Sequence, residues 1–348
     1  MTDLRLDITS ENICFFKNFH HALRENPRID IILKMPKCTV LRIKFFNDKK
    51  RVVMSLSNGL MLVYNMAEYV IQKILVNKMA VIDIIKILDD KYLITAGIDS
   101  KIRVWNPDLE KMVAKFEAHN YSVLHMVCLK EHIFSYGYDM KLKKFKFKTK
   151  SLETTIDIEH SITAMKLIKS VDEADPIKLA AAFINGDIAL YDLNLKLLKL
   201  VTLKTTNEES IRLINSSNTE MLVFSKEGSI TVLNNTTLEE GKSGSIFNLK
   251  NEDYIDLILI KSREFFLFTL ERQKIEFFNA STFKKTDSWD YFFEKDLISC
   301  DKNKDGSKIF VSDKSGFTIL FNFMKHLDST KENLVPCNRR KHIMFKGV

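Results

Sequence analysis

The chain has 348 residues, of which 45% are hydrophobic and 28% charged, so it can bury a large core and remain soluble. Its 10 glycines and 5 prolines exclude collagen-like and low-complexity organisation, and no apolar run is long enough to cross a membrane. The formal net charge of +8 mildly favours an acidic partner such as nucleic acid, although lysine-rich composition alone makes many basic proteins that bind none.

The cysteines and the first residues bear on the cellular compartment. The five cysteines are odd in number and widely spaced, without a C-x-x-C pair, which favours reduced thiols over a disulfide framework. Residues 1–7 contain acidic side chains and no uninterrupted apolar stretch, unlike a secretory signal. We therefore expect an intracellular protein, cytoplasmic or nuclear/nucleolar, without membrane insertion. The cysteines are Cys14, Cys38, Cys128, Cys300 and Cys337.

Residues 1–27 are predicted to form an N-terminal extension. Ser10 is a suitable N-cap, and Ile13, Phe16, His20 and Leu23 would share one face of a helix over residues 10–25. Two interpretations remain open: the helix covers the folded core, or it docks onto a partner.

From residue 28 to residue 323 the pattern changes to short strands grouped in repeating units of four. The second strands of the units are predicted at residues 51–56, 92–96, 133–136, 179–183, 221–225, 265–269 and 309–312. Outer strands are predicted at residues 69–76, 111–116, 152–158, 196–203, 238–247 and 283–289. The units have the length of a repeat that buries a continuous core only when several copies stack.

An aromatic or apolar anchor residue ends the third strand of each unit, and successive anchors lie 40 to 46 residues apart. The residue after the anchor is Asn or Asp in six of the seven units, with Lys146 as the exception. Four units place a glycine in the turn before the third strand, where a positive φ costs glycine nothing. The anchors are Tyr64, Trp105, Phe145, Tyr191, Leu233, Phe278 and Phe321, and the glycines are Gly59, Gly186, Gly228 and Gly316.

The second unit carries the most specific motif. Thr95 lies four residues before Asp99, and Trp105 follows six residues after it, with alternating Ile102 and Val104 in the intervening strand. This spacing resembles a blade of the WD-repeat β-propeller family. The resemblance implies an all-β fold, a single seven-bladed propeller, and hydrogen bonds that join Thr95, Asp99 and Trp105 to one another.

The third unit matches the same family network at other positions. His119, Ser135 and Asp139 fall where the family has a loop histidine, a strand hydroxyl and a turn aspartate, whereas Phe145 replaces the tryptophan and cannot donate. A structural role for His119 is favoured over a metal ligand or a general base. His160 lies in the following loop with fewer suitable neighbours, and the structural interpretation is favoured there too.

The seventh unit lacks a convincing outer strand after Phe321. The β-rich segment 28–35 precedes the first unit and would complete the last one, which closes the ring and removes free sheet edges. Residues 324–348 are predicted to be a basic C-terminal tail containing Arg339, Arg340 and Lys341.

Two further motifs are weak. The segment Asp301–Ser307 begins like an EF-hand calcium loop, but its twelfth position is Ser312 instead of a bidentate Glu, so a hairpin turn at Asp305 is favoured. The segment Gly241–Ser243 resembles the end of a phosphate-binding loop without its first glycine. No spacing places an acid and a base together, so we expect no catalytic activity, no metal, no cofactor and no small-molecule substrate.

Six lysines occupy residues 141–150 without one acidic residue, on a third strand that should be buried on both faces. One interpretation is that the stems pack while the amines reach the sheet ends. The other is a basic patch for phosphate or an acidic protein, with Phe147 available to stack on a base. The candidate partner-binding residues are Lys141, Lys143, Lys146, Lys148, Lys150, Arg339, Arg340 and Lys341, and Lys144 is assigned to packing.

The family resemblance implies a non-catalytic scaffold that docks partner proteins in a multi-subunit assembly. The charge and the lysine strand favour a ribonucleoprotein or ribosome-biogenesis complex, with other proteins of the complex as partners and RNA as a further candidate. The alternative is a protein-only adaptor in a ciliary, ubiquitin-ligase or transport complex, and the salt dependence of RNA binding would separate the two.

Overall fold

The structure, a computed structural model, contains strands and turns and no helix among the residues that it describes. These are residues 29–34, 38–48, 50–67, 70–76, 82–88, 90–108, 111–168, 177–203, 211–216, 220–225, 229–245, 254–261, 264–269, 274–279, 282, 284–289 and 295–322. The prediction of an all-β chain is confirmed for them. The predicted helix over 10–25 and the tail 324–348, with Arg339, Arg340 and Lys341, lie outside the described residues, as does Gly228.

The strands form seven antiparallel sheets of four strands each. Sheet 1 contains β2 (Val40–Phe45), β3 (Arg51–Leu56), β4 (Leu60–Asn65) and β5 (Val70–Val76). Sheet 2 contains β6 (Ile82–Leu88), β7 (Tyr92–Gly97), β8 (Lys101–Asn106) and β9 (Lys111–Glu117). Sheet 3 contains β10 (Val123–Leu129), β11 (His132–Gly137), β12 (Lys141–Lys146) and β13 (Ser151–Asp157). Sheet 4 contains β14 (Ile162–Ile168), β15 (Lys178–Phe183), β16 (Asp187–Tyr191) and β17 (Leu197–Thr202).

The remaining sheets follow the same order. Sheet 5 contains β18 (Ile211–Ser216), β19 (Glu220–Ser225), β20 (Ser229–Asn234) and β21 (Glu240–Ser245). Sheet 6 contains β22 (Tyr254–Lys261), β23 (Glu264–Thr269), β24 (Lys274–Asn279) and β25 (Lys285–Trp289). Sheet 7 contains β26 (Leu297–Lys302), β27 (Lys308–Asp313), β28 (Phe317–Asn322) and β1 (Ile29–Lys34).

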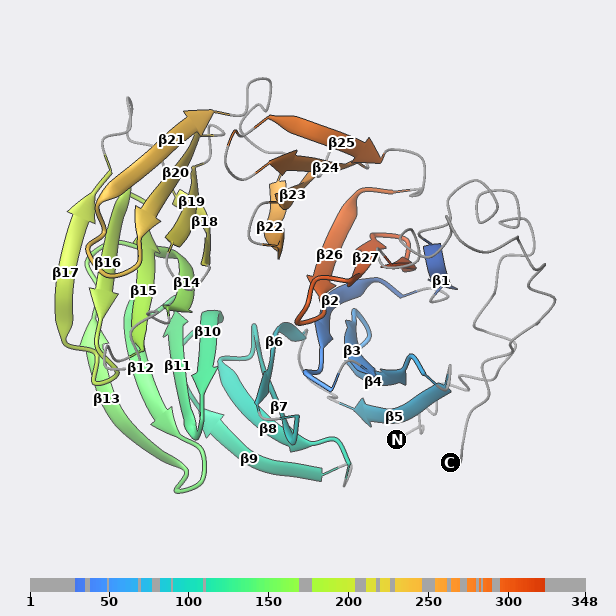
Figure 1. Ribbon diagram of the computed structural model, residues 1–348. Helices are drawn as coiled ribbons and strands as arrows, with labels where there is room; N and C mark the ends of the chain where they lie inside the picture. Colours follow the sequence, from blue (N-terminus) through green and yellow to red (C-terminus); the bar gives the residue numbers. More distant parts are fainter. Residues whose placement is uncertain are drawn as a thin grey trace.

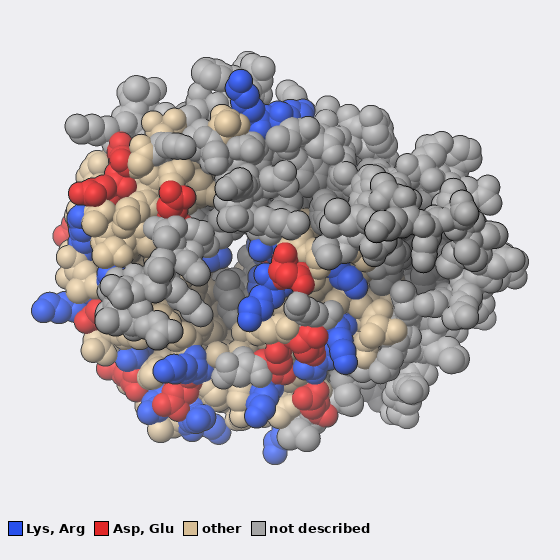
Figure 2. All heavy atoms as spheres, in the orientation of Figure 1, with Lys and Arg blue, Asp and Glu red and all other residues tan. Residues whose placement is uncertain are grey.

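The sheets are arranged around a common centre, and in sheets 1 to 6 the chain runs from the innermost to the outermost strand (Figure 1). The innermost strands β2, β6, β10, β14, β18, β22 and β26 contact one another in that order, and β26 contacts β2 again. Figure 2 shows an opening at the centre of this ring.

The ring is closed by a strand from the start of the described chain. β1 pairs antiparallel with β28, with Leu33 opposite Thr318 and Ile29 opposite Phe321. For residues 29–34, this confirms the prediction that a segment before the first unit completes the last sheet. On the inner side of the same junction, main-chain N–H groups of β2 donate to side chains of β26: Ile43 to Ser299 Oγ at 3.0 Å and Phe45 to Asp301 Oδ2 at 2.8 Å.

Every predicted anchor lies at or next to the end of a third strand. At each anchor the pairing register between the third and the outer strand shifts, which is the signature of a bulge. A bulge increases local twist, so its repetition at equivalent positions gives the outer strands a common bend. The repeat read from the sequence therefore describes backbone geometry as well as residue type.

The Asn or Asp after the anchor begins the turn to the outer strand. Asn65 Oδ1 accepts from the main-chain N–H of Ala67 at 2.9 Å, and Asn106 Oδ1 accepts from Asp108 at 3.0 Å. Asp192 and Asn234 accept equivalent hydrogen bonds in sheets 4 and 5. These are Asx turns, which explains why the position favours these two residue types.

The turn between the second and third strands, here called the central turn, also repeats. Its last residue has a positive φ at Gly59 (86°), Gly186 (87°) and Gly316 (81°), as the glycine pattern predicts. Ser100 (61°) and Met140 (57°) adopt the same left-handed conformation in sheets 2 and 3 without glycine. The turn geometry is thus maintained even where the residue type opposes it.

The core consists of hydrophobic clusters between adjacent sheets. One cluster joins sheets 7 and 1 and includes Leu33 of β1, with the rings of Phe45 and Phe310 at a centroid distance of 5.7 Å. Another joins sheets 2 and 3 through Phe116 and Phe145. Strands such as β4 and β16 are buried on both faces, so they show continuous apolar runs instead of alternation.

Candidate functional site

His119 is the centre of a hydrogen-bonded network in sheet 3. Its Nδ1 donates to Asp139 Oδ1 in the central turn at 2.8 Å, and its Nε2 lies 2.8 Å from Ser135 Oγ on β11. The main-chain N–H of Asn120 donates to Asp139 Oδ2 at 3.2 Å. Burial lowers the pKa of His119, although hydrogen bonding to the Asp139 carboxylate opposes this. The neutral ring therefore accepts from Ser135 while it donates to Asp139.

The surroundings hold the imidazole in place. A Cβ atom on Gly137 would lie 2.5 Å from both Cγ and Nδ1 of His119, so this position requires glycine for space. The main-chain N–H groups of Ala118 and His119 both donate to the carbonyl of Ser100 in the central turn of sheet 2, at 3.1 Å. The loop that carries His119 is thereby fixed to two neighbouring sheets, and the expected structural role of His119, Ser135 and Asp139 agrees with this geometry.

The network predicted for sheet 2 is only half formed. Trp105 Nε1 donates to Thr95 Oγ1 at 3.0 Å, as expected. Asp99 does not join this pair: its carboxylate instead binds the guanidinium of Arg103 four residues later. The predicted contact between Asp99 and Trp105 is therefore wrong. Arg103 and its neighbour Val104 lie on opposite faces of β8, and the Arg103 side chain reaches the end of the strand pair at which Asp99 lies. Of the hydrogen bonds that the WD-repeat resemblance implies, sheet 2 contains the tryptophan–threonine pair and sheet 3 the histidine network.

A surface depression of about 430 Å³ lies directly above these networks. It is lined by residues 98–100 of one central turn, residues 120–122 of the connecting loop and Tyr138 of the next central turn. Ile98 and Tyr121 are 63% exposed and Tyr138 is 70% exposed, and the two tyrosine rings meet edge to face at a centroid distance of 6.4 Å. Large apolar side chains that remain this accessible are available for contact with another molecule.

The backbone under the depression is pinned. The main-chain N–H of Tyr138 donates to the carbonyl of Ser122 at 2.9 Å, and Ser122 Oγ donates to the carbonyl of Ile98 at 3.4 Å. The turn charges are neutralised locally, since Asp99 binds Arg103 and Asp139 lies 3.7 Å from Lys143 Nζ. The depression therefore offers apolar and uncharged polar groups on a rigid base.

The tip of the central turn differs from sheet to sheet. It is Ile98 in sheet 2, Tyr138 in sheet 3 and Ile184 in sheet 4, and all three are exposed. The equivalent residue is Ser57 in sheet 1 and Lys314 in sheet 7. We call Ile98, Tyr121, Tyr138 and Ile184 the turn-tip surface. Because the same backbone position accepts Ser57 and Lys314, folding does not require an apolar tip.

The lysines of β12 do not form one patch, because they lie at opposite ends of the strand. At the central-turn end Lys141 Nζ contacts Asp157 Oδ1 at 2.5 Å, and Lys143 Nζ donates to the carbonyl of Ala118 at 2.7 Å. Lys146 lies five positions after Lys141 on the strand, which is roughly 17 Å at the usual rise per residue.

At the other end of β12, Lys146 and Lys148 share one carboxylate. Their Nζ atoms lie 3.1 Å and 3.5 Å from the oxygens of Glu131. The hydrogen bond from Lys146 lowers the pKa of Glu131. Lys150 is exposed in the adjoining turn, with a positive φ of 55°. Only this end presents several accessible cations together.

Lys144 has the packing role that its strand position predicts. Its side chain is buried, and its amine reaches Glu153 Oε2 at 3.1 Å and Asn194 Oδ1 at 3.4 Å. Phe147, considered as a stacking residue, is buried against Tyr92 and is not available to a base. The interpretation in which lysine stems pack and amines reach the sheet ends thus fits most of the strand. On the face shown in Figure 2, cationic and anionic side chains are interspersed over the described surface.

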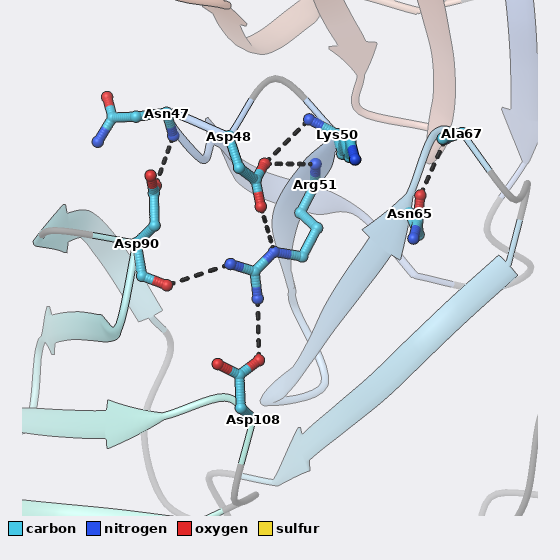
Figure 3. Close-up of polar contacts among 8 residues, drawn as sticks. All are labelled: Asn47, Asp48, Lys50, Arg51, Asn65, Ala67, Asp90 and Asp108. Atoms are coloured by element: carbon cyan, nitrogen blue, oxygen red, sulfur yellow. Dashed lines mark hydrogen bonds and ion pairs between the residues drawn. The ribbon is translucent and has the colours of Figure 1, made fainter.

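One cluster was not anticipated from the sequence. Arg51 at the start of β3 contacts Asp48 in its own turn through Nε at 2.5 Å, and Asp108 of sheet 2 through NH1 at 2.9 Å (Figure 3). Its third nitrogen, NH2, donates to the carbonyl of Asp90 at 3.1 Å, and its guanidinium lies 4.4 Å from the ring centroid of Phe46. Arg51 therefore links sheets 1 and 2 at the end opposite the central turns. Its partners come from separate turns, so no local pattern marks the contact.

The segment that begins like a calcium loop is the turn between β26 and β27. Gly306 has a φ of 70°, and Ser307 donates to Asp305 at 2.6 Å, so the hairpin interpretation is confirmed. The Asp301 carboxylate is occupied by Lys44 Nζ at 2.6 Å and by the N–H of Phe45. Across the described residues, no three His, Cys, Asp or Glu side chains are grouped to hold a metal.

The other motif residues have plain surroundings. His160 is exposed, and Asn185 donates to Asp187 at 2.7 Å. Gly241 belongs to the outer strand β21.

Cys38, Cys128 and Cys300 do not form disulfide bonds. In the part of the chain that the structure describes, no helix is long and apolar enough to span a membrane.

Comparison with protein-family models finds no match, and comparison with curated proteins finds none either.

Proposed function

We propose that the chain is a seven-bladed β-propeller of the WD-repeat type. The proposal is supported by seven four-stranded sheets, by the closed cycle of contacts among their innermost strands and by the completion of sheet 7 by β1. The Trp105–Thr95 hydrogen bond and the His119 network are two separate halves of the family's blade motif. A ring of this kind presents turns from several sheets on one rigid face.

We further propose that the protein is a non-catalytic platform whose turn-tip surface docks a protein partner. The observation that carries this is the row of exposed apolar tips, Ile98, Tyr138 and Ile184, in three successive sheets whose backbone also accepts Ser57 and Lys314. Water contact of large apolar side chains is unfavourable, and tyrosine is enriched at protein interfaces because its ring is rigid and its hydroxyl can hydrogen-bond.

The partner is a protein segment that inserts an uncharged side chain into the depression. Asp99 and Asp139 are both neutralised within the molecule, so the depression has no free charge to attract a phosphate or an ammonium group. The main-chain hydrogen bond of Tyr138 already fixes this turn, so less conformational entropy is lost when a partner binds. His119 is held by its structural contacts, which supports a role without catalysis.

The test has two stages. First, the tagged full chain is purified from the cells that naturally express it, and proteins that co-purify in stoichiometric amounts are identified. Second, each of these proteins is titrated against the pure chain to measure its affinity. The double substitution Tyr121→Ser with Tyr138→Ser is expected to weaken one companion at least tenfold, since buried aromatic contacts dominate such interfaces. The matched control is Lys314→Ser at the equivalent tip of sheet 7, which should leave that affinity unchanged. Equal affinity for the tyrosine variant and wild type would refute the proposal.

The ribonucleoprotein setting is the second candidate, and the end of β12 with Lys146, Lys148 and Lys150 is the place to test it. Each phosphate contact with single-stranded RNA contributes about 0.7 to the slope of log affinity against log salt, so reversing three charges should lower the slope by about two. The Glu131 carboxylate between Lys146 and Lys148 weakens this candidate. Salt-independent or undetectable RNA binding would remove it in favour of the protein-only adaptor.

A further inference from the structure

The outer strand of sheet 4, β17 (Leu197–Thr202), has an unusually apolar edge. It lies at the periphery of the ring and pairs only with β16 among the described strands (Figure 1). Along an edge strand every second residue directs its N–H and C=O away from the sheet, ready to pair with another strand. The edge of β17 is therefore a row of main-chain donors and acceptors facing outwards.

The side chains do not protect this edge. Leu197, Leu198 and Leu200 are 49%, 48% and 53% exposed, with Lys199 as the only charged residue within the strand. The outer strands of sheets 2 and 3 are interrupted by more charges: β9 contains Lys111, Lys115 and Glu117, and β13 contains Glu153 and Asp157. Charged side chains on an edge are a common way to prevent pairing with other chains, and β17 has little of this protection.

The charge near the edge indicates which occupant fits. Lys199 donates to the carbonyl of Thr237, which carries no charge, and Lys196 is exposed just before the strand. Neither lysine forms an ion pair with a described residue. An added strand would bring a side chain close to each of them.

We propose that β17 accepts an extended segment of a partner protein as a fifth strand of sheet 4, with apolar residues against the leucines and carboxylates against Lys196 and Lys199. Main-chain hydrogen bonds supply the attachment, and the alternating side chains supply the selectivity. A second copy of this chain fits less well, because antiparallel pairing of two β17 strands would gather the lysines of both copies without an acid between them. This site goes beyond the turn-tip surface, and each site can fail without the other.

The probe is a fluorescent ten-residue peptide of alternating valine and glutamate, titrated against the full chain by anisotropy. Two peptides of the same length serve as comparisons: one with lysine in place of glutamate, and one with alternate main-chain nitrogens methylated so that it cannot pair. The first peptide should bind at least tenfold more tightly than either comparison. No binding of the first peptide at millimolar concentration, or equal binding of all three, would overturn the proposal.

Variants distinguish binding at the β17 edge from non-specific binding to exposed apolar residues. Leu198→Glu with Leu200→Glu should abolish binding, whereas Leu152→Glu, which alters an exposed leucine of β13, should leave it unchanged. Because the leucine variant could also disturb folding, Lys196→Glu with Lys199→Glu provides an independent check: it should reverse the preference towards the lysine peptide. Loss of binding in the β13 variant, or an unchanged preference after charge reversal, would refute the assignment. Concentration-dependent dimers that vanish in the leucine variant would point to a second copy instead and would also refute it.

Discussion

The structural role of His119 can be tested by replacing it with alanine. The substitution removes the ring that joins Asp139 in the central turn to Ser135 on β11. Ser135 is fully buried, so its hydroxyl loses its hydrogen-bond partner inside the protein. The Asp139 carboxylate keeps only the N–H of Asn120 at 3.2 Å and the amine of Lys143 at 3.7 Å.

The expected loss follows from these contacts. A hydrogen bond to a charged group contributes about 1.5–3 kcal/mol and a neutral one about 0.5–1.5 kcal/mol. The cavity left by a buried imidazole adds to both, so the free energy of unfolding should fall by about 3–5 kcal/mol. Equilibrium denaturation by urea, followed by circular dichroism, measures the difference.

His160→Ala is the matched control, because His160 occupies the equivalent loop before sheet 4 and is exposed. Its effect should stay within about 0.5 kcal/mol, as for most exposed positions. A loss below about 1 kcal/mol for His119→Ala, or equal losses for the two variants, would refute the reasoning from hydrogen bonds.

The same residue predicts a pH dependence. Burial lowers the pKa of His119 in the folded state, whereas the unfolded chain binds a proton near the ordinary value of about 6.5. Below that pH the unfolded state holds more protons, so the free energy of unfolding decreases on acidification. The slope reaches at most about 1.4 kcal/mol per pH unit for one proton. His119→Ala should flatten the curve between neutral pH and the folded-state pKa, and an unchanged curve would contradict the assignment.

Three further experiments test other parts of the molecule. In double-mutant cycles of unfolding free energy, Trp105→Phe should have a coupling energy of about 1 kcal/mol with Thr95→Val and of less than about 0.5 kcal/mol with Asp99→Ala. Strong coupling between Trp105 and Asp99 would show that Asp99 does join the Trp105–Thr95 pair. Arg51→Ala should cost about 2–4 kcal/mol in urea denaturation, because it removes the charged partner of Asp48 and the donor groups that reach Asp108 and the carbonyl of Asp90 in sheet 2, and a loss below about 1 kcal/mol would refute the linkage. Deletion of residues 1–35 should produce aggregation detectable by light scattering, since it uncovers β28, and a soluble, cooperatively unfolding product would contradict the ring closure.

The repeat was predictable because each unit needs the same turn chemistry. The anchor fixes the bulge and the following Asn or Asp accepts the turn N–H, so residue type and spacing carry the backbone geometry. The strand within residues 28–35 was also predictable, because the sequence has a β-rich segment before the first unit and no convincing outer strand in the seventh unit. The first strand of the seventh unit extends further than its apolar run, to Lys302, because Asp301 is used by β2.

The contacts between units were not predictable in the same way. Arg51 joins turns that lie 39 and 57 residues further along the chain, and only the placement of adjacent sheets brings them together. Asp99 was assigned to Trp105 by resemblance, although Arg103 is a nearer and charged partner. The turn-tip surface had a usable signal: the residue at the tip of each central turn is apolar in Ile98, Tyr138 and Ile184 and polar elsewhere among the described turns.

The closure of sheet 7 by β1 has a consequence for biosynthesis. Lys34 pairs with Phe317, which lies 283 residues further along the chain. At about 5–20 residues per second, a ribosome needs roughly 15–60 s to make the intervening chain. During that time β1 has emerged without its partner, and Leu33, which ends in the core, has no surface to cover. The nascent chain therefore carries an unpaired, aggregation-prone β-strand for most of its synthesis, until β28 leaves the ribosome.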